Sequence, residues 1–167
     1  MTGRAVEVLA VPAGPDALTI LPALHRALAG VGPVLLPVPT AGPGRRTEPD
    51  LSPLTPDEDD LDDPTALVVS TSGSTGDPKG TLLPVSALRA SAAATQDRLG
   101  GPGSWLLALP GQHIAGLQVL IRSILAGTAP VVMDLREGFS PNGFIASTQE
   151  LRLQPGTSRR YTSLVPT

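Results

Sequence analysis

The sequence has no cysteine in its 167 residues, which excludes disulfides, thiolate metal sites and cysteine nucleophiles. Its 2 histidines, His25 and His113, are too few for a histidine-based metal cluster. Aromatic residues are 2% of the chain, so platforms for stacking nucleic acid bases are not expected. The 12 basic and 15 acidic residues give a net charge of -3, the wrong sign for a protein that neutralises phosphate backbones. We therefore expect no nucleic-acid partner.

From the sequence we expect neither an export signal nor a membrane span. Residues 1–7 place an acidic residue inside a short apolar run and contain no small-residue cleavage site. The longest apolar stretch, residues 114–133, is interrupted by Gln118, Arg122 and a Gly-Thr-Ala-Pro break that a bilayer-spanning helix tolerates poorly. Together with the absence of cysteine, this pattern predicts a cytoplasmic protein.

Glycine and proline are abundant instead, with 18 and 19 residues. Residues 39–64 combine recurring proline and glycine with 8 of the 15 acidic residues, a composition typical of an exposed linker. A metal site over residues 57–63 is the alternative, but the glycine and the spacing of a calcium loop are missing. We predict an N-terminal strand-helix-strand portion over residues 1–38, a linker over 39–64, and a portion over 65–167 that contains the candidate ligand-binding segments.

Apolar periodicity predicts an α/β fold with a mainly parallel sheet and helices on both faces, because strands and helices alternate along the chain. Leucines spaced over residues 18–28 indicate the first helix, which ends at Gly30. The other predicted helices cover residues 85–99, 114–126 and 143–151, and the predicted strands cover residues 5–11, 34–38, 66–70, 105–109, 129–133 and 161–165.

One loop carries the strongest chemical signal. Directly after a buried strand, the chain reads Thr71-Ser72-Gly73-Ser74-Thr75-Gly76-Asp77-Pro78-Lys79-Gly80. Glycines let backbone N–H groups approach an anion, hydroxyls add donors, and the only lysine of the chain adds a compact charge. The loop is not a Walker A motif, because no Gly-Lys-Ser/Thr triplet occurs. A flexible surface turn is the alternative, and phosphate binding is favoured.

This loop resembles the signature loop of the adenylate-forming superfamily. The resemblance implies that the chain is part of the large N-terminal domain of such an enzyme. It also implies that the loop grips the β- and γ-phosphates of ATP, with Mg²⁺, while an acid attacks the α-phosphate and releases pyrophosphate. The phosphate-binding residues implied in this way are Thr71, Ser72, Gly73, Ser74, Thr75, Gly76 and Lys79.

A second segment, residues 109–116, resembles the superfamily's next motif, a proline-led loop that ends in histidine at the start of a helix. The resemblance places His113 and Gly116 in the pocket for the acid. A neutral imidazole suits this place, since the positive end of a helix disfavours protonation. The alternative for His113 is a helix-start histidine satisfied by nearby backbone.

Within the superfamily, the likeness is greatest to the o-succinylbenzoate–CoA ligases of menaquinone biosynthesis. It rests on the spacing His113-x2-Gly-x-Gln-x3-Arg122 and on residues 162–167, which include Ser163. A helical projection places Gln118 and Arg122 together at the edge of the apolar arc. Arg122 would then meet the second carboxylate of a dicarboxylic acid, with Ser163 shaping the same pocket. A surface arginine with its stem along the helix is the alternative.

The resemblance implies an acid–CoA ligase that uses ATP, Mg²⁺ and CoA. Superfamily features that should follow Thr167 are a Thr-Glu motif, a ribose-binding aspartate and a late lysine, so no complete set of catalytic residues is present. We therefore expect this chain to be inactive by itself, and to self-associate through the edge of its last strand. A ligase for another carboxylic acid, and a stand-alone nucleotide- or acyl-binding module, are the alternatives.

Overall fold

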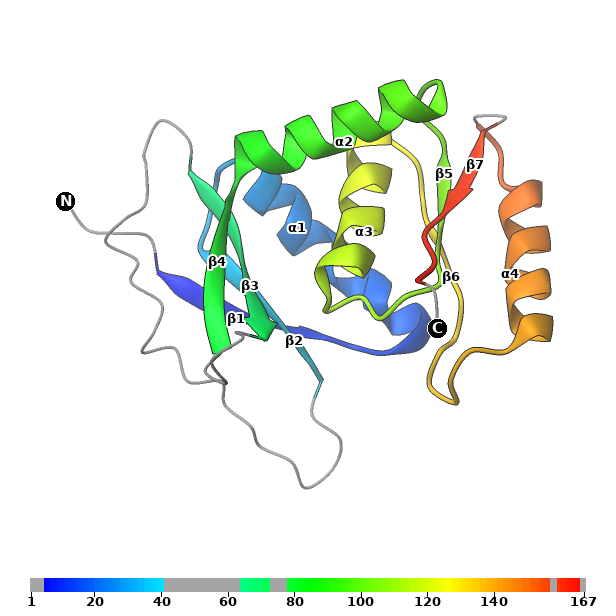
Figure 1. Ribbon diagram of the computed structural model, residues 1–167, viewed down its shortest axis with the longest axis horizontal. Helices are drawn as coiled ribbons and strands as arrows, with labels where there is room; N and C mark the ends of the chain where they lie inside the picture. The colour runs from blue at the N-terminus through cyan, green and yellow to red at the C-terminus, as the bar shows by residue number, and fades with distance from the viewer. Residues whose placement is uncertain (1–4, 41–63, 73–77, 157–158, 166–167) are drawn as a thin grey trace.

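The computed structural model describes residues 5–40, 64–72, 78–156 and 159–165, with the backbone alone for residues 70–72, 78 and 79. Two sheets and their helices form the molecule (Figure 1). In chain order the elements are β1 (Val6–Val11), the 3₁₀ helix η1 (Gly14–Ile20), α1 (Leu21–Leu28), β2 (Val34–Pro39), β3 (Thr65–Ser72), β4 (Pro78–Pro84), α2 (Val85–Leu99), β5 (Ser104–Leu107), α3 (Ile114–Ala126), β6 (Val131–Val132), α4 (Pro141–Leu153) and β7 (Arg160–Thr162).

The α/β fold predicted from the sequence is confirmed, and the arrangement of its strands is more complex than expected. The first sheet has the order β1-β2-β3-β4, and the second has the order β6-β5-β7. All described pairings are parallel except that of β3 with β4. The prediction included one sheet and no strand at β4. Because β2 pairs with β3, the portions before and after the predicted linker share one sheet. Residues 41–63 of that linker lie outside the described residues.

Glycines end two of the helices. The predicted bounds of α2 and α3 are confirmed, and each helix is followed by a glycine with a positive φ, Gly100 at 85° and Gly127 at 65°. The left-handed conformation is open to glycine at little cost, so both positions end a helix. The first predicted helix is corrected, because residues 14–20 form a 3₁₀ helix and the α-helix begins only at Leu21, beside Pro22.

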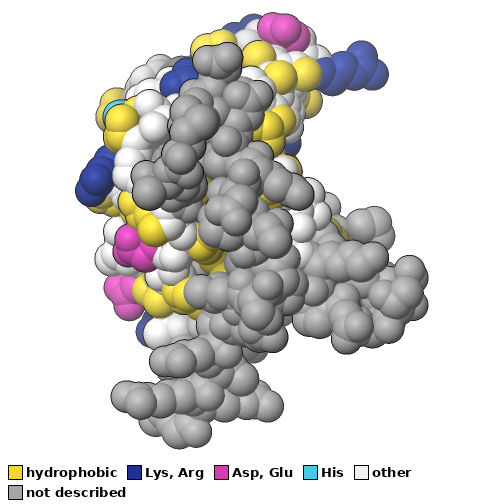
Figure 2. All heavy atoms as spheres, turned by 90° about the vertical axis from the view of Figure 1, so that its left-hand side faces the viewer, with side chains coloured by type: hydrophobic (Ala, Val, Ile, Leu, Met, Phe, Trp, Pro, Cys, Tyr) yellow, Lys and Arg dark blue, Asp and Glu magenta, His cyan; other side chains and the backbone are white. Residues whose placement is uncertain are grey.

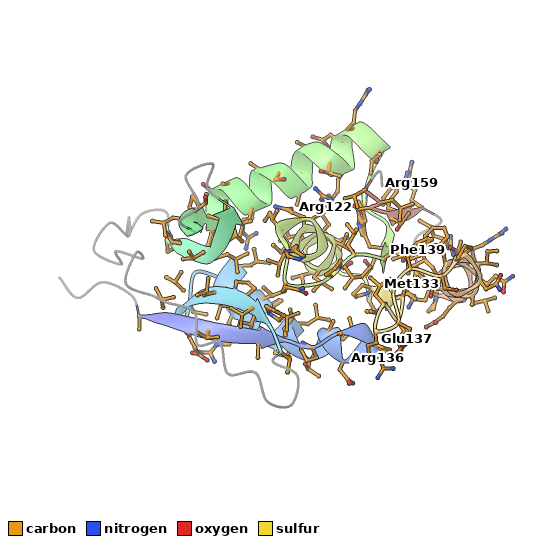
Figure 3. The ribbon with its side chains drawn as sticks, turned by 60° about the horizontal axis from the view of Figure 1, so that its bottom comes forward. Arg122, Met133, Arg136, Glu137, Phe139 and Arg159 are labelled. Atoms are coloured by element: carbon orange, nitrogen blue, oxygen red, sulfur yellow. The ribbon has the colours of Figure 1, made fainter. Side chains whose placement is uncertain are left out.

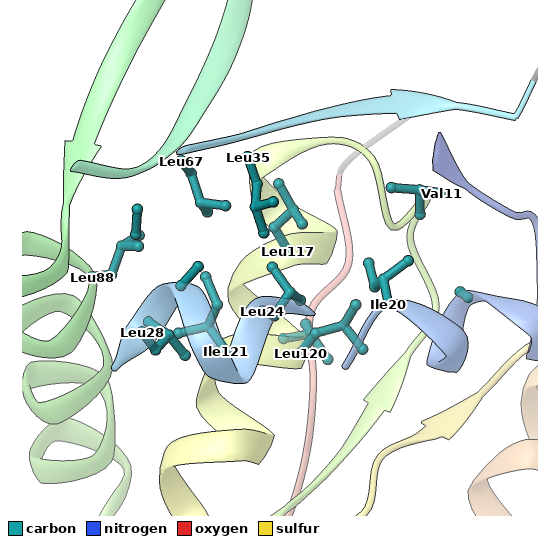
Figure 4. Packing of buried hydrophobic residues seen from close by; sticks show 14 of the residues in the cluster. Val11, Ile20, Leu24, Leu28, Leu35, Leu67, Leu88, Leu117, Leu120 and Ile121 are labelled. Carbon is teal, nitrogen blue, oxygen red and sulfur yellow. The ribbon is translucent and has the colours of Figure 1, made fainter. Parts of the chain in front are cut away.

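α3 lies between the two sheets and is buried on most sides (Figure 1). Its residues Leu117, Leu120 and Ile121 are fully buried and pack with the leucines of α1 and of the first sheet (Figure 4). Burial of this apolar surface is the main force that holds the helix between the sheets. On the other face of the second sheet, Leu151 of α4 packs against Leu106 of β5. The second sheet therefore has a helix on each face.

Charged side chains on the described surface are mixed in sign. On the face shown in Figure 2, basic and acidic side chains of the described residues are scattered rather than gathered into one basic patch. Within the described residues, no helix combines the length and the hydropathy that crossing a bilayer requires.

Candidate acid-binding and phosphate-binding site

Two segments of the site leave the second sheet at one edge. β5 and β7 are parallel, and Leu106 pairs with Thr162. The carboxyl ends of parallel strands meet at the same edge of a sheet, which is where ligands bind in α/β folds. The loop from β5 to His113 begins there, and half-buried Ser163 directly follows β7. The structure therefore brings Ser163 to the edge from which the loop before α3 departs.

His113 occupies the N-cap position of α3. Its backbone carbonyl accepts a hydrogen bond of 2.9 Å from the N–H of Leu117, and its own N–H donates to the carbonyl of Pro110 at 3.3 Å. The side chain of His113 is exposed and makes no capping hydrogen bond. The backbone thus fixes the residue at the start of the helix, while the imidazole faces solvent and is accessible to a ligand.

Gly116 is buried in the first turn of α3. A Cβ atom added there would lie 2.2 Å from the carbonyl oxygen of Pro110 and 3.0 Å from the Cα of Gly111. The loop before the helix therefore packs directly on the helix backbone, and only glycine leaves room for it. The structure gives Gly116 a role in placing this loop, and its contact with a substrate stays a prediction.

Arg122 lies on α3 beside the second sheet (Figure 3). The side chain is half-buried, and its Cζ atom lies 5.3 Å from the centre of the Trp105 ring. This is the distance of a cation–π contact. Burial lowers the pKa of the Arg122 guanidinium from its ordinary value, because the charged form loses hydration. A half-buried side chain is expected both for carboxylate binding and for the alternative, a surface arginine with its stem along the helix.

Trp105 supports this guanidinium from β5. The ring is 2% exposed and lies 5.0 Å from the ring of Tyr161, its partner residue on β7. The Tyr161 hydroxyl is anchored in turn, donating toward the carbonyls of Leu99 at 3.1 Å and Gly101 at 2.9 Å. Trp105 could not be recognised from the sequence as part of the site, because its contact with Arg122 joins two elements and has no local pattern.

The predicted phosphate loop lies at the turn of the β3–β4 hairpin. Thr71 pairs with Lys79, and Ser72 pairs with Pro78, in antiparallel register. The backbone of the hairpin therefore brings both ends of the loop together. Gly73, Ser74, Thr75 and Gly76 lie outside the described residues, so their phosphate contacts stay predictions.

A separate cavity of about 260 Å³ lies at the carboxyl ends of β1, β2, β5 and β6. Gly111 and Gln112 of the loop before α3 line this cavity, together with Met133 and Arg136. Arg136 and Arg122 lie well apart in Figure 3, so this cavity is distinct from the surroundings of Arg122.

Asp134 and Arg136 form an ion pair over Gly14 near this cavity. Arg136 Nε donates to Asp134 Oδ1 at 2.9 Å and to Oδ2 at 3.0 Å, and an additional contact joins Arg136 Nη2 to Oδ2. The hydrogen bonds from Arg136 lower the pKa of Asp134 from 3.8 to about 2. A lowered pKa in the folded state stabilises the protein above the unfolded value, and this stabilisation is lost as the pH falls toward about 2.

We expect Asp134→Asn to reduce the midpoint of thermal unfolding slightly at pH 7, with the difference from the wild type shrinking below pH 4. The measurement is a series of unfolding curves between pH 2 and pH 7. Glu150→Gln is the control, because it removes one acidic charge at an exposed position of α4. A difference that stays constant down to pH 2 would contradict the role of the ion pair.

Comparison with known proteins identifies the family. A model described as "AMP-binding enzyme" matches residues 15–154. The chain belongs to the AMP-binding enzyme family. Two proteins of Mycobacterium tuberculosis strains, named probable 2-succinylbenzoate–CoA ligases, are 49% identical over 160 residues, which is 96% of this chain and 39% of each relative. The chain thus spans about two fifths of the length of these relatives.

Two further proteins are similar to this chain, one in sequence and one in fold. A 2-succinylbenzoate–CoA ligase of Enterococcus faecalis is 36% identical over 85 residues, 44% of this chain and 18% of that protein. The structure of o-succinylbenzoate CoA synthetase from Bacillus subtilis, in complex with the acyl-adenylate intermediate, matches 90% of this chain and 48% of its own. Its TM-score is 0.59 at 22% sequence identity, a similarity that concerns the fold. The predicted resemblance to the adenylate-forming superfamily and to these ligases is therefore confirmed.

Proposed function

We propose that the protein acts as an ATP-dependent acid–CoA ligase on an aromatic dicarboxylic acid of the 2-succinylbenzoate type, a reaction of menaquinone biosynthesis. The observation that carries the substrate class is the half-buried Arg122 on α3, the helix that His113 begins. A guanidinium removed from water gains most from an ionic partner. A dicarboxylic acid offers one carboxylate for activation and a second for this partner. The relatives named above support the same choice.

The phosphate loop would supply the other half of the site. We propose that the β3–β4 hairpin presents the hydroxyls of residues 71–75 and the ammonium of Lys79 to the leaving pyrophosphate. Compact donors placed where negative charge accumulates lower the barrier of such a transfer. Residues 1–38 and 65–167 would then form two parts of one nucleotide-binding domain, with residues 39–64 as their linker.

Magnesium fits this arrangement when it is bound mainly through phosphate. In the part of the chain that the structure describes, no group of three His, Asp or Glu side chains could hold a metal ion. Mg²⁺ in nucleotide sites is commonly held by substrate phosphates and water with few carboxylates. Bound in this way, Mg²⁺ neutralises charge on ATP, and the chain contributes the donors of the hairpin. CoA would be the second substrate, which takes the acyl group from the adenylate.

The experiment uses the protein expressed from its complete reading frame. We expect Arg122→Ala to raise KM for 2-succinylbenzoate about 10- to 100-fold, because a charge-assisted hydrogen bond is lost. Benzoate, with one carboxylate, should change less than about threefold. Pyrophosphate release measures both reactions. Arg98→Ala, which removes an exposed arginine of α2, is the control and should leave both acids unaffected. Equal losses for the two acids would contradict the role of Arg122, and a preference for a monocarboxylic acid would contradict the substrate class.

A further inference from the structure

Three buried side-chain polar atoms on or beside α3 have no hydrogen-bond partner. They are Nε1 of Trp105, Oε1 of Gln118 and Nε of Arg122, and no other buried side-chain nitrogen or oxygen of the described residues is in this condition. Gln118 and Arg122 are one helical turn apart, and Trp105 lies against Arg122. The partnerless atoms are therefore concentrated in one part of the molecule.

Such a concentration needs an explanation, because a buried polar atom without a partner is unfavourable. The rest of the described core satisfies its polar side chains, as Ser123 shows by donating to the carbonyl of Val119 at 3.0 Å. Gln118 also lowers stability at its half-buried position, where an apolar residue would pack without an unsatisfied polar atom. A bound ligand would remove the cost for Gln118 and Arg122 together.

The two α3 side chains complement each other. Gln118 Oε1 is an acceptor without a donor, and Arg122 Nε carries a donor without an acceptor. Side chains four residues apart on a helix are neighbours, so this pair can form when Arg122 turns toward a ligand. Arg122 would then retain its terminal N–H groups for a carboxylate, and Gln118 would retain its NH₂ group.

The order along α3 indicates what that NH₂ group would meet. At 1.5 Å per residue, Gln118 lies about 7.5 Å beyond His113 along the helix axis, and Arg122 about 6 Å further. Along the helix axis Gln118 lies between His113 and Arg122, and around the axis it lies on the same side as Arg122, about 40° away. A group next to the carboxylate that Arg122 would bind would therefore meet Gln118.

We propose that Gln118 is a specificity-determining residue, whose amide donates to a ketone oxygen between the two carboxylates of the acid while Arg122 binds one of those carboxylates. The inference rests on the function proposed above and adds the ketone to the recognised features. In 2-succinylbenzoate, a ketone joins the ring, which bears one carboxylate, to the chain that bears the other. The ligase would therefore distinguish a keto acid from its analogue with a methylene at that position.

The test compares two acids in the protein expressed from its complete reading frame. The acids are 2-succinylbenzoate and 2-(3-carboxypropyl)benzoate, which differs by a methylene in place of the ketone. We expect the wild type to prefer the keto acid about tenfold in kcat/KM, as suits one buried hydrogen bond. Gln118→Met preserves the size and helix preference of the side chain and removes its donor. In this variant the two acids should have about equal kcat/KM, because activity on the keto acid is lost.

Two further variants separate recognition from folding. Gln149→Met makes the same replacement at an exposed position of α4 and should preserve the tenfold preference. Gln118→Glu also lacks the donor and should lose the preference as well. If the methionine variant fails to fold, the glutamate variant still tests the role of Gln118.

The outcomes separate the two proposals. An unchanged preference in both Gln118 variants, or a wild type that uses the two acids equally, would overturn the role of Gln118 and leave the ligase activity standing. A wild type that activates neither acid would overturn the proposed function and this inference with it.

Discussion

Gly116→Ala is expected to destabilise the protein by about 3 kcal/mol, the cost of forcing an atom into a well-packed interior. The added Cβ would lie 2.2 Å from a backbone oxygen, that of Pro110, so no side-chain rotation relieves the contact. Either the loop before α3 or the helix must move. Because His113 ends this loop, we also expect the proposed acid site to lose its geometry. Urea unfolding measures the first effect, and kcat/KM of the protein expressed from its complete reading frame measures the second.

Gly143→Ala is the matched control. Gly143 is also in the first turn of a helix, α4, but an added Cβ would meet its nearest atom, Met133 Cε, at 3.4 Å, an ordinary contact. Alanine is favoured over glycine in helices, so this variant should equal the wild type or exceed it by up to about 1 kcal/mol. If the two variants lost equal stability, the close packing of the Pro110 loop would not be the cause.

Trp105→Ala is the second large effect that we expect, a loss of about 3 to 5 kcal/mol in the free energy of unfolding. The ring is 2% exposed and fills the space between Tyr161 and the Arg122 guanidinium. Its removal leaves a cavity and ends the cation–π contact, so the position of Arg122 should be lost too. Urea unfolding gives the stability.

Trp105→Phe should cost much less than alanine, about 1 to 2 kcal/mol, because an aromatic ring remains and the lost indole N–H has no partner in the described structure. Phe139→Ala is a control at an aromatic residue that is 56% exposed, where we expect a loss below about 1 kcal/mol. A phenylalanine variant as unstable as the alanine variant would show that the indole N–H, and not the ring, stabilises this region.

The local features of the fold were predictable from the sequence. The bounds of α2 and α3 follow from apolar periodicity and from the glycines that end them. The strand β4 was not predicted, because its central residues alternate weakly and depend on pairing with β3, as Val68 with Leu82. The division of the strands into two sheets was also missed, since it depends on contacts between elements distant in sequence.

The candidate site shows the same limit. Projecting one helix predicted Arg122 at the border of the apolar face. In the structure Val119 and Ser123 are buried as well, so Arg122 lies in the middle of the less buried side of α3. The same projection placed Gln118 beside Arg122, but gave no sign that Gln118 Oε1 is buried without a partner. The contribution of Trp105 needs β5 and α3 side by side, and no sequence period records that contact.

The pairing of Trp105 with Tyr161 has a consequence for synthesis on the ribosome. β5 is the central strand of its sheet, yet its partner β7 is encoded about 56 residues later. At the usual pace of translation, roughly 3 to 10 s separate the emergence of the two strands. Throughout that interval one edge of β5 has no neighbour, and the indole ring of Trp105 lacks the phenol ring that lies against it in the folded protein. The nascent chain therefore exposes its only tryptophan for seconds, during which chaperones or neighbouring chains can bind there.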